Sequence, residues 1–141
     1  MKIKDVCKII IDAIYSSCSR CRAGRYDGKI AILPDGYRLF LIDEKDCFFD
    51  IEKINRGQPE FNVSSAINLD RDYKIGVLAE IITIKGVSKA KLVNGDDFVY
   101  VNHKFLKVFD KSAVYKFTNE IQPVLVYEFD KLVGLIMPIK K

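Results

Sequence analysis

Cys18 and Cys21 stand in the Cys-x-x-Cys spacing that is typical of redox-active and zinc-binding motifs. A closed zinc site takes four ligands, yet Cys7 and Cys47 do not form a second such pair and His103 is the only histidine. The strand–helix–strand context of thioredoxin-type proteins is also missing around the pair. We therefore interpret the cysteines as reduced thiols and predict no metal or cofactor, while the role of Cys18 and Cys21 stays open.

An acidic cluster is the second group whose residue types suggest chemistry. Its members surround a predicted strand and are Asp43, Glu44, Asp46, Asp50 and Glu52. Carboxylates gathered in this way can hold a divalent cation, but acids at strand ends are more often turn residues, and we favour that interpretation. His103 has no evident carboxylate to orient it as a catalytic base, and no glycine-rich phosphate loop is present. We predict a protein that is not an enzyme.

The composition is that of a folded domain. Among 141 residues, 49% are hydrophobic and 30% are charged, which excludes collagen-like and disordered chains. A single domain over residues 1–141 is expected from this length. No apolar run reaches the roughly 18 residues that a membrane span needs, and the start of the chain does not resemble a signal peptide. We expect a soluble cytoplasmic protein without a membrane partner, and its net charge of +4 is only mildly basic.

The elements that would position these residues begin with a helix over residues 1–24. Apolar residues recur there at helical spacing from Val6 onwards, Asp5 can cap the start, and Gly24 can end the helix. A first half-sheet is predicted over residues 29–54, with a hairpin of Lys29–Leu33 and Tyr37–Ile42, and with Cys47–Ile51 as a further strand. Residues 55–72 are predicted to form an irregular loop.

Residues 75–141 form the second half of the prediction. Val77–Lys85 is a strongly apolar strand, and Asn94-Gly95-Asp96 predicts a tight turn between two further strands. Asn102 is expected to cap a short helix over His103–Lys111. A strand over Ala113–Thr118 and a terminal hairpin turning at Phe129-Asp130 complete the chain. We predict an α+β fold in which two helices pack on one face of an antiparallel sheet.

The last forty residues resemble the end of the C-terminal domain of bacterial DNA polymerase sliding clamps, which are processivity factors of DNA replication. The resemblance rests on Phe98–Asn102 leading into Lys104-Phe105-Leu106, on the strand from Ala113, and on the hairpin that ends in Met137-Pro138. The order helix–sheet–helix–sheet is similar to that of one whole clamp domain. Similar short clamp-like chains occur among phage and prophage proteins.

The resemblance implies a binding site and partners. Clamps receive short apolar peptides of polymerases and other clients in a cleft near the Met-Pro tail, and the corresponding residues here are Ile136, Met137, Pro138 and Ile139. The family tail usually continues with an arginine and an apolar residue, whereas this chain ends in Lys140 and Lys141. A complete ring needs six domains, so a homo-oligomer is one implied assembly. The predicted function is a non-catalytic interaction module that binds a protein partner of DNA replication or phage biology.

The alternative is a DNA-associated protein. In clamps, basic helical faces contact the DNA backbone, and such phosphate contacts are independent of sequence and sensitive to salt. The residues that would face duplex DNA here are Lys4, Lys8, Arg22, Lys104, Lys107 and Lys111. Ile11 and Tyr15 on the outer face of the first helix are unexpected for a surface that lines DNA. A simple solvated face explains the same lysines.

Overall fold

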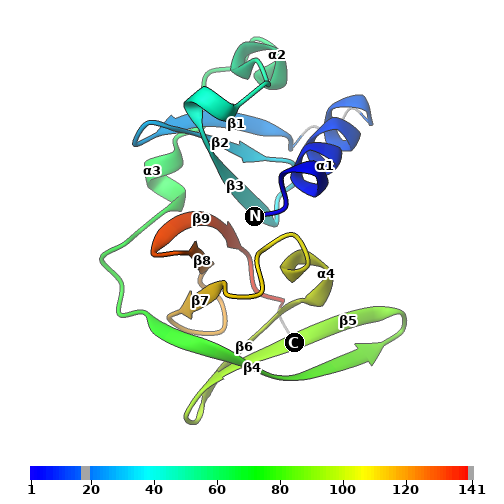
Figure 1. Ribbon diagram of the computed structural model, residues 1–141. Coiled ribbons are helices and arrows are strands. Elements are labelled where there is room, and N and C mark those ends of the chain that lie inside the picture. The colour runs from blue at the N-terminus through cyan, green and yellow to red at the C-terminus, as the bar shows by residue number, and fades with distance from the viewer. Residues whose placement is uncertain (17–19, 140–141) are drawn as a thin grey trace. The chain divides into compact units, whose positions relative to one another are not determined.

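The computed structural model describes residues 1–16 and 20–139 (Figure 1). The chain, predicted as one domain, divides into two compact units. The N-terminal unit is Ile3–Leu69, and the C-terminal unit combines Met1–Lys2 with Asp70–Lys141. Both units are built from antiparallel strand pairs and a few helices, so the α+β class is confirmed.

The N-terminal unit contains a helix followed by three strands that pair in chain order. Its elements are α1 (Ile3–Tyr15), β1 (Arg22–Tyr26), β2 (Lys29–Leu33), β3 (Arg38–Asp43), the 3-10 turn η1 (Glu44–Asp46), α2 (Ile51–Asn55) and α3 (Val63–Ala66). The predicted hairpin is confirmed, with Ile30 opposite Ile42 and Ile32 opposite Phe40. The central side chains of both strands, Ile30–Ile32 and Leu39–Ile42, are buried in the core of this unit.

The N-terminal helix is shorter than predicted. It ends at Tyr15, whereas Arg22 and Gly24 lie in strand β1 and not in a helix over residues 1–24. Gly24 does not end the helix; it allows a close approach of two backbone segments, because a Cβ atom there would lie 2.2 Å from the carbonyl oxygen of Phe61. The local helical pattern could not reveal this long-range contact.

Two further expectations for this unit are wrong. Cys47–Ile51 is not a strand, because Asp50 accepts a hydrogen bond from the backbone of Glu52 (2.9 Å) and caps α2, which starts at Ile51. The predicted irregular loop over 55–72 contains the helical turn α3. At the end of α2, the buried amide of Asn55 accepts from the backbone N–H of Ala23 and donates to its carbonyl, which fixes the edge of β1.

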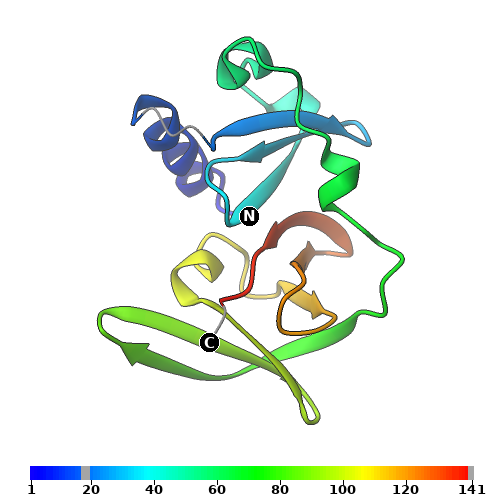
Figure 2. The same cartoon turned by 180° about the vertical axis from the view of Figure 1, so that it is seen from behind.

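The C-terminal unit contains the strands from β4 to β9 and one short helix. Its elements are β4 (Lys74–Ile84), β5 (Val87–Asn94), β6 (Asp97–Asn102), α4 (His103–Leu106), β7 (Val114–Phe117), β8 (Val124–Glu128) and β9 (Lys131–Ile136). The strands lie in the order β9-β8-β7-β4-β5-β6. Figures 1 and 2 show β4 and β5 as a long two-stranded ribbon whose turn lies away from β7.

The predicted turns of this unit are confirmed. Asn94 pairs with Asp97 across the Gly95-Asp96 turn, and Gly95 has a positive φ of 60°. Phe129 and Asp130 join β8 to β9 with φ values of 51° and 63°, as a tight hairpin turn requires. Local turn chemistry therefore determines both hairpins.

Helix α4 is shorter than the predicted span His103–Lys111. Asn102 caps it as expected, by accepting a hydrogen bond from the backbone of Lys104 (3.0 Å). The helix ends at Leu106, and the backbone N–H of Asp110 donates to Glu128 Oε2 (2.6 Å). This donor is therefore not used in a helical turn, which explains why the segment after Leu106 is a series of turns. Val108 and Phe109 are nevertheless buried in the core.

Candidate functional site

The Met-Pro tail lies beside strand β6 in the C-terminal unit. Strand β9 ends at Ile136, and the backbone N–H of Ile139 then donates to the carbonyl oxygen of Tyr100 (2.8 Å). Ile136 is fully buried, whereas Met137, Pro138 and Ile139 are half-buried. Of the four predicted tail residues, Ile136 is thus a core residue and the following three are accessible to a partner.

A small apolar pocket lies where the tail meets the sheet. It has a volume of about 230 Å³ and is lined by Ile82, Ile84, Lys89, Tyr100 and Ile139. We call it the tail pocket. Ile82 and Ile84 come from β4, Lys89 from β5 and Tyr100 from β6. Their side chains share one face of the sheet, because the register places Ile82 opposite Lys89 and Tyr100 opposite Lys91. Apolar walls with one cation and one phenol suit an apolar side chain next to an acceptor group.

Aromatic and cationic side chains continue this face of the sheet next to the tail pocket. Phe98 and Tyr100 pack edge to face with ring centroids 5.6 Å apart. The ammonium nitrogen of Lys91 lies 4.6 Å from the centroid of the Phe98 ring, and 3.9 Å from Glu80. These contacts hold the two aromatic rings in one orientation beside the tail pocket.

The sequence missed four of the five tail-pocket residues. Only Ile139 was predicted, since the other four lie on strands that were assigned to the sheet without a function. The alternation of Tyr100 with buried Val99 and Val101, taken together with the Gly95 turn, was the available signal. It places Tyr100 on the opposite face from the core of this unit.

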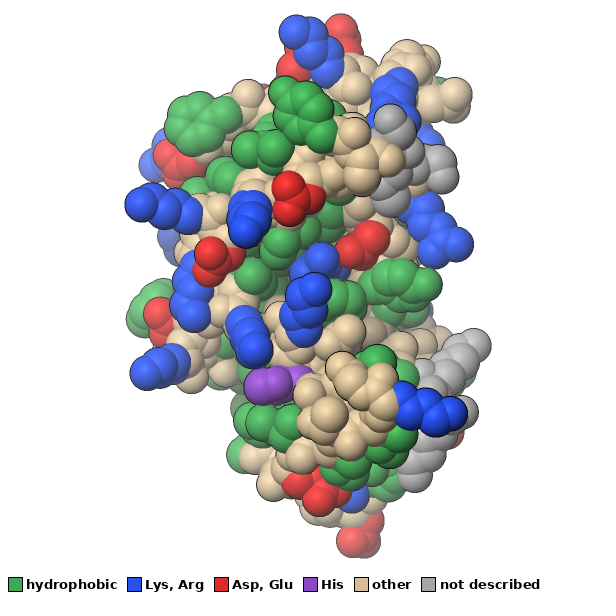
Figure 3. All heavy atoms as spheres, turned by 90° about the vertical axis from the view of Figure 1, so that its right-hand side faces the viewer, with side chains coloured by type: hydrophobic (Ala, Val, Ile, Leu, Met, Phe, Trp, Pro, Cys, Tyr) green, Lys and Arg blue, Asp and Glu red, His purple; other side chains and the backbone are tan. Residues whose placement is uncertain are grey.

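The six residues proposed to face DNA do not share one kind of surface. Lys4 and Lys8 are exposed on α1, but Arg22 is half-buried in β1, where it donates to Asn55 Oδ1 (3.3 Å) and to the carbonyl oxygen of Pro59. Assigning Arg22 to a helical face is therefore wrong. Lys104 lies on α4, whereas Lys107 and Lys111 follow it in turns, and all three are exposed. Figure 3 shows basic, acidic and apolar side chains interspersed on one face of the molecule.

The cysteines and acids of the described residues do not assemble into a metal-binding cluster. Cys18 lies outside the described residues, so the Cys-x-x-Cys pair has no geometry to report. Cys7 and Cys47 are half-buried thiols outside any disulfide, and Cys21 is buried. Within residues 1–16 and 20–139, no group of three or more His, Cys, Asp or Glu side chains is placed to hold a metal ion. His103 is half-buried at the first position of α4.

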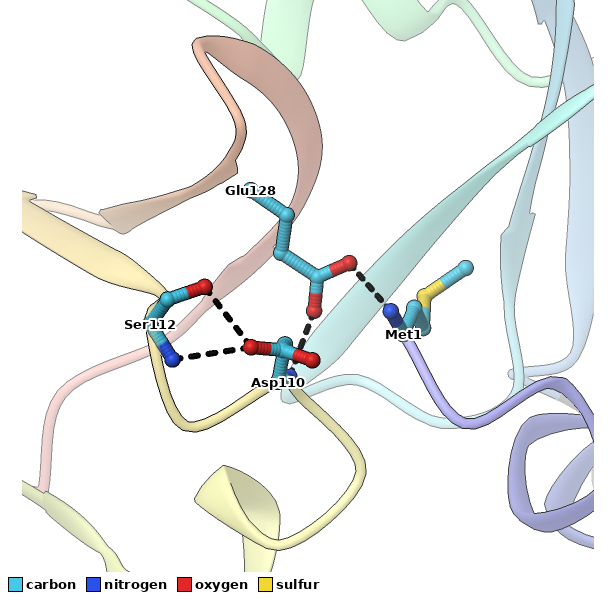
Figure 4. A network of polar contacts seen from close by, with 4 residues as sticks. All are labelled: Met1, Asp110, Ser112 and Glu128. Atoms are coloured by element: carbon cyan, nitrogen blue, oxygen red, sulfur yellow. Dashed lines mark hydrogen bonds and ion pairs between the residues drawn. The ribbon is translucent and has the colours of Figure 1, made fainter.

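Glu128 is the centre of a polar network within the C-terminal unit (Figure 4). Its carboxylate is buried, forms an ion pair with the amino group of Met1, and accepts the hydrogen bond from Asp110. Asp110 in turn accepts from the backbone N–H (2.9 Å) and the hydroxyl (2.7 Å) of Ser112. These hydrogen bonds from Ser112 hold the pKa of Asp110 below its usual value.

Tyr115 lies near this network. Burial of its phenol, with a further contribution from the negative charge of Glu128, raises the pKa of Tyr115 to about 12. The partners of Glu128 are backbone and terminal groups, which points to a structural role in joining β8 to the segment after α4. We therefore place the candidate functional site at the tail pocket and not at Glu128.

Comparison with protein-family models, with curated proteins and with solved structures finds no match to this chain. Among the helices of the described segments, none has the length and apolar character that crossing a membrane requires.

Proposed function

We propose that the chain is a non-catalytic interaction module of the sliding-clamp type, which binds a protein partner of DNA replication or phage biology in the cytoplasm. The observation that carries the proposal is the order of the elements. In each unit a helix precedes three strands that pair in chain order, α1 before β1-β2-β3 and α4 before β7-β8-β9. This order supports the resemblance to one clamp domain, which is an argument from fold to function by analogy.

The same proposal covers the finer points of the fold and the assembly. It includes two helices packed on one face of an antiparallel sheet, as in a clamp domain. It also includes self-assembly of the chain, because a ring of six domains would need several copies of a chain of this size. Light scattering that gives a multiple of 16.1 kDa would support this part.

The tail pocket supports a peptide-binding role. It lies beside the Met-Pro tail, it is apolar, and its volume of about 230 Å³ suits one or two apolar side chains of a peptide. The accessible tail residue Ile139 forms part of its wall. A partner would therefore be held by an apolar anchor and oriented by Lys89 or the hydroxyl of Tyr100.

The test measures binding of short apolar peptides taken from the C-terminus of a bacterial replicative polymerase, by fluorescence anisotropy. Ile139→Asp should weaken binding about tenfold or more, because it places a charge in an apolar pocket. Phe129→Asp is the matched control, since Phe129 is 78% exposed in the β8–β9 turn and does not line the tail pocket. Equal binding by wild type and Ile139→Asp, with both folded by circular dichroism, would remove the tail pocket from the proposal.

A further inference from the structure

Strand β4 has two pairing partners, and each of them covers a different part of the strand. Lys74–Gly76 pairs with β7, whereas Val77–Ile84 pairs with β5 alone. Over the described parts of the chain, no strand pairs with the other side of Val77–Ile84. We call this side of residues 77–84 the β4 edge.

The hairpin turn determines which backbone groups face the β4 edge. Lys85 and Gly86 form a two-residue turn with φ values of 51° and 80°. In such a hairpin the flanking pair, Ile84 and Val87, is hydrogen-bonded, and the next pair is not. The hydroxyls of that next pair, Thr83 and Ser88, are only 2.9 Å apart. The N–H and C=O groups of Thr83 therefore point away from β5, and by alternation so do those of Ile81.

The side chains along the β4 edge are apolar and exposed on both faces of the strand. The exposed fractions are 63% for Val77, 47% for Leu78, 48% for Ile81 and 53% for Ile84. Edge strands in soluble proteins are normally short or protected by charges, since unpaired strands recruit other chains. Here Glu80 and a bulge between Leu78 and Glu80 are the protection within the strand. An occupant in extended conformation would satisfy the backbone and cover the apolar side chains at once.

The charges around the β4 edge indicate the chemistry of the occupant. Residues 74–94 contain four lysines and one acid, Glu80. Lys74 pairs with Asp97 and Lys91 lies near Glu80, whereas Lys85 and Lys89 have no carboxylate within ion-pair distance in the described residues. A second copy of the chain would bring the same positive charge to the interface, which is unfavourable. An extended segment that carries acids is complementary.

We propose that the β4 edge binds an extended, apolar segment with acidic residues from a partner protein, which adds to the sheet as a strand next to β4. The inference rests on the proposed function and adds to it the mode of binding and the chemistry of the partner. A side chain of the added strand that lies beside Ile82 and Ile84 enters the tail pocket. An acid next to it pairs with Lys89 at the wall of the same pocket.

The probe is a ten-residue peptide with valine and isoleucine at alternate positions, threonine between them and aspartate at both ends. Thr83→Pro removes a backbone donor from the β4 edge without removing a hydrogen bond to β5. Thr83→Val is the matched control, because it loses the same hydroxyl contact with Ser88 but keeps the donor. Circular dichroism and thermal unfolding establish that both variants are folded.

We expect wild type and Thr83→Val to bind the probe equally. Thr83→Pro should bind it at least about tenfold more weakly. Methylation of the backbone nitrogens in the middle of the probe should abolish binding. Replacing the aspartates by lysines, or Lys89→Glu, should weaken it. Equal affinity of Thr83→Pro and Thr83→Val for the probe would overturn the inference.

Two further outcomes separate this inference from the proposed function. A dimer in light scattering that Thr83→Pro dissociates would show that a second copy occupies the β4 edge, and the inference would be wrong. Binding of polymerase peptides that depends on Ile139, together with no binding of the strand probe, would leave the proposed function intact and reject the β4 edge. Binding of the strand probe together with no binding of the polymerase peptides would support the β4 edge and reject the proposed function.

Discussion

Among the described residues of the C-terminal unit, Glu128 is the one acid that is almost fully buried, at 5% exposure. Its two carboxylate oxygens have different partners, the amino group of Met1 and the backbone N–H of Asp110. A buried charge without its counterion costs much more than the intact pair contributes. The network therefore makes the C-terminal unit depend on residues that are far apart in the sequence.

Glu128→Gln should lower the free energy of unfolding by about 3 kcal/mol, because the amino group of Met1 loses its counterion. Urea unfolding measures this loss, and Glu120→Gln, at an exposed acid, is the control and should change little. The same variant should lower the pKa of Tyr115 from about 12, while burial of the phenol, which is the larger cause, keeps it above 10.

Absorbance of the tyrosinate gives that second readout. Since the pKa of Tyr115 is raised in the folded protein, its contribution to stability is complete below the unfolded value of 10 and is lost as the pH rises through about 12. Unchanged stability in Glu128→Gln, with an unchanged titration of Tyr115, would contradict the role given to the network.

At the scale of elements, the hairpins were predictable and the helix ends were not. Gly95 and the Phe129-Asp130 pair occupy left-handed conformations that are determined within two or three residues, so the pattern of the sequence is sufficient. The end of α4 depends instead on Glu128, eighteen residues beyond Asp110. A local sequence pattern cannot predict this contact between distant residues. It also cannot predict that Gly24 lies in β1, close to the backbone of Phe61.

The apolar run of β4 was the least predictable feature. A continuous apolar strand normally indicates burial on both faces, yet most residues of β4 are exposed. The sequence correctly predicts a strand, but its exposure depends on β7, which pairs only with Lys74–Gly76. For this reason Ile82 and Ile84, and with them the tail pocket, were not among the predicted site residues.

Gly24→Ala tests how closely strand β1 and the segment at Phe61 approach. A Cβ atom at 2.2 Å from the carbonyl oxygen of Phe61 forces the backbone apart, and we expect a loss of about 2 kcal/mol or more in the free energy of unfolding. Gly36→Ala is the control, because its Cβ would meet the flexible side chain of Arg20 at 3.1 Å and not backbone. Equal stability of the two variants in thermal unfolding would show that β1 can move away without cost.

At the scale of the whole molecule, the number of exposed basic residues that can act together bears on the DNA-associated alternative. Arg22 is bound to Asn55 and Pro59. The exposed Lys4 and Lys8 lie on α1 in the N-terminal unit. Lys104, Lys107 and Lys111 are the members of the predicted set that are exposed in the C-terminal unit and expected to act together. Three phosphate contacts imply a logarithmic salt slope of about −2.7, which is a loss of roughly 40-fold in affinity between 50 and 200 mM salt.

We therefore expect duplex DNA to bind weakly at 50 mM salt and to be released at 200 mM, as measured by fluorescence anisotropy. Replacing Lys104, Lys107 and Lys111 by glutamine should flatten the slope, while binding of the polymerase peptides stays unchanged. A slope steeper than about −6 in the wild type would require more contacts than these lysines provide and would favour the DNA-associated alternative.

The β4 edge also affects the solubility of the protein when no partner is bound. A strand of eight residues with open backbone groups and little charge is the type of segment on which chains stack into cross-β fibrils at high concentration. The bulge near Glu80 and the lysines around the hairpin are the features that oppose such stacking. Under the proposed strand addition, synthesis of this chain in excess over its partner would leave the β4 edge uncovered, so balanced synthesis of the two becomes a matter of solubility as well as of function.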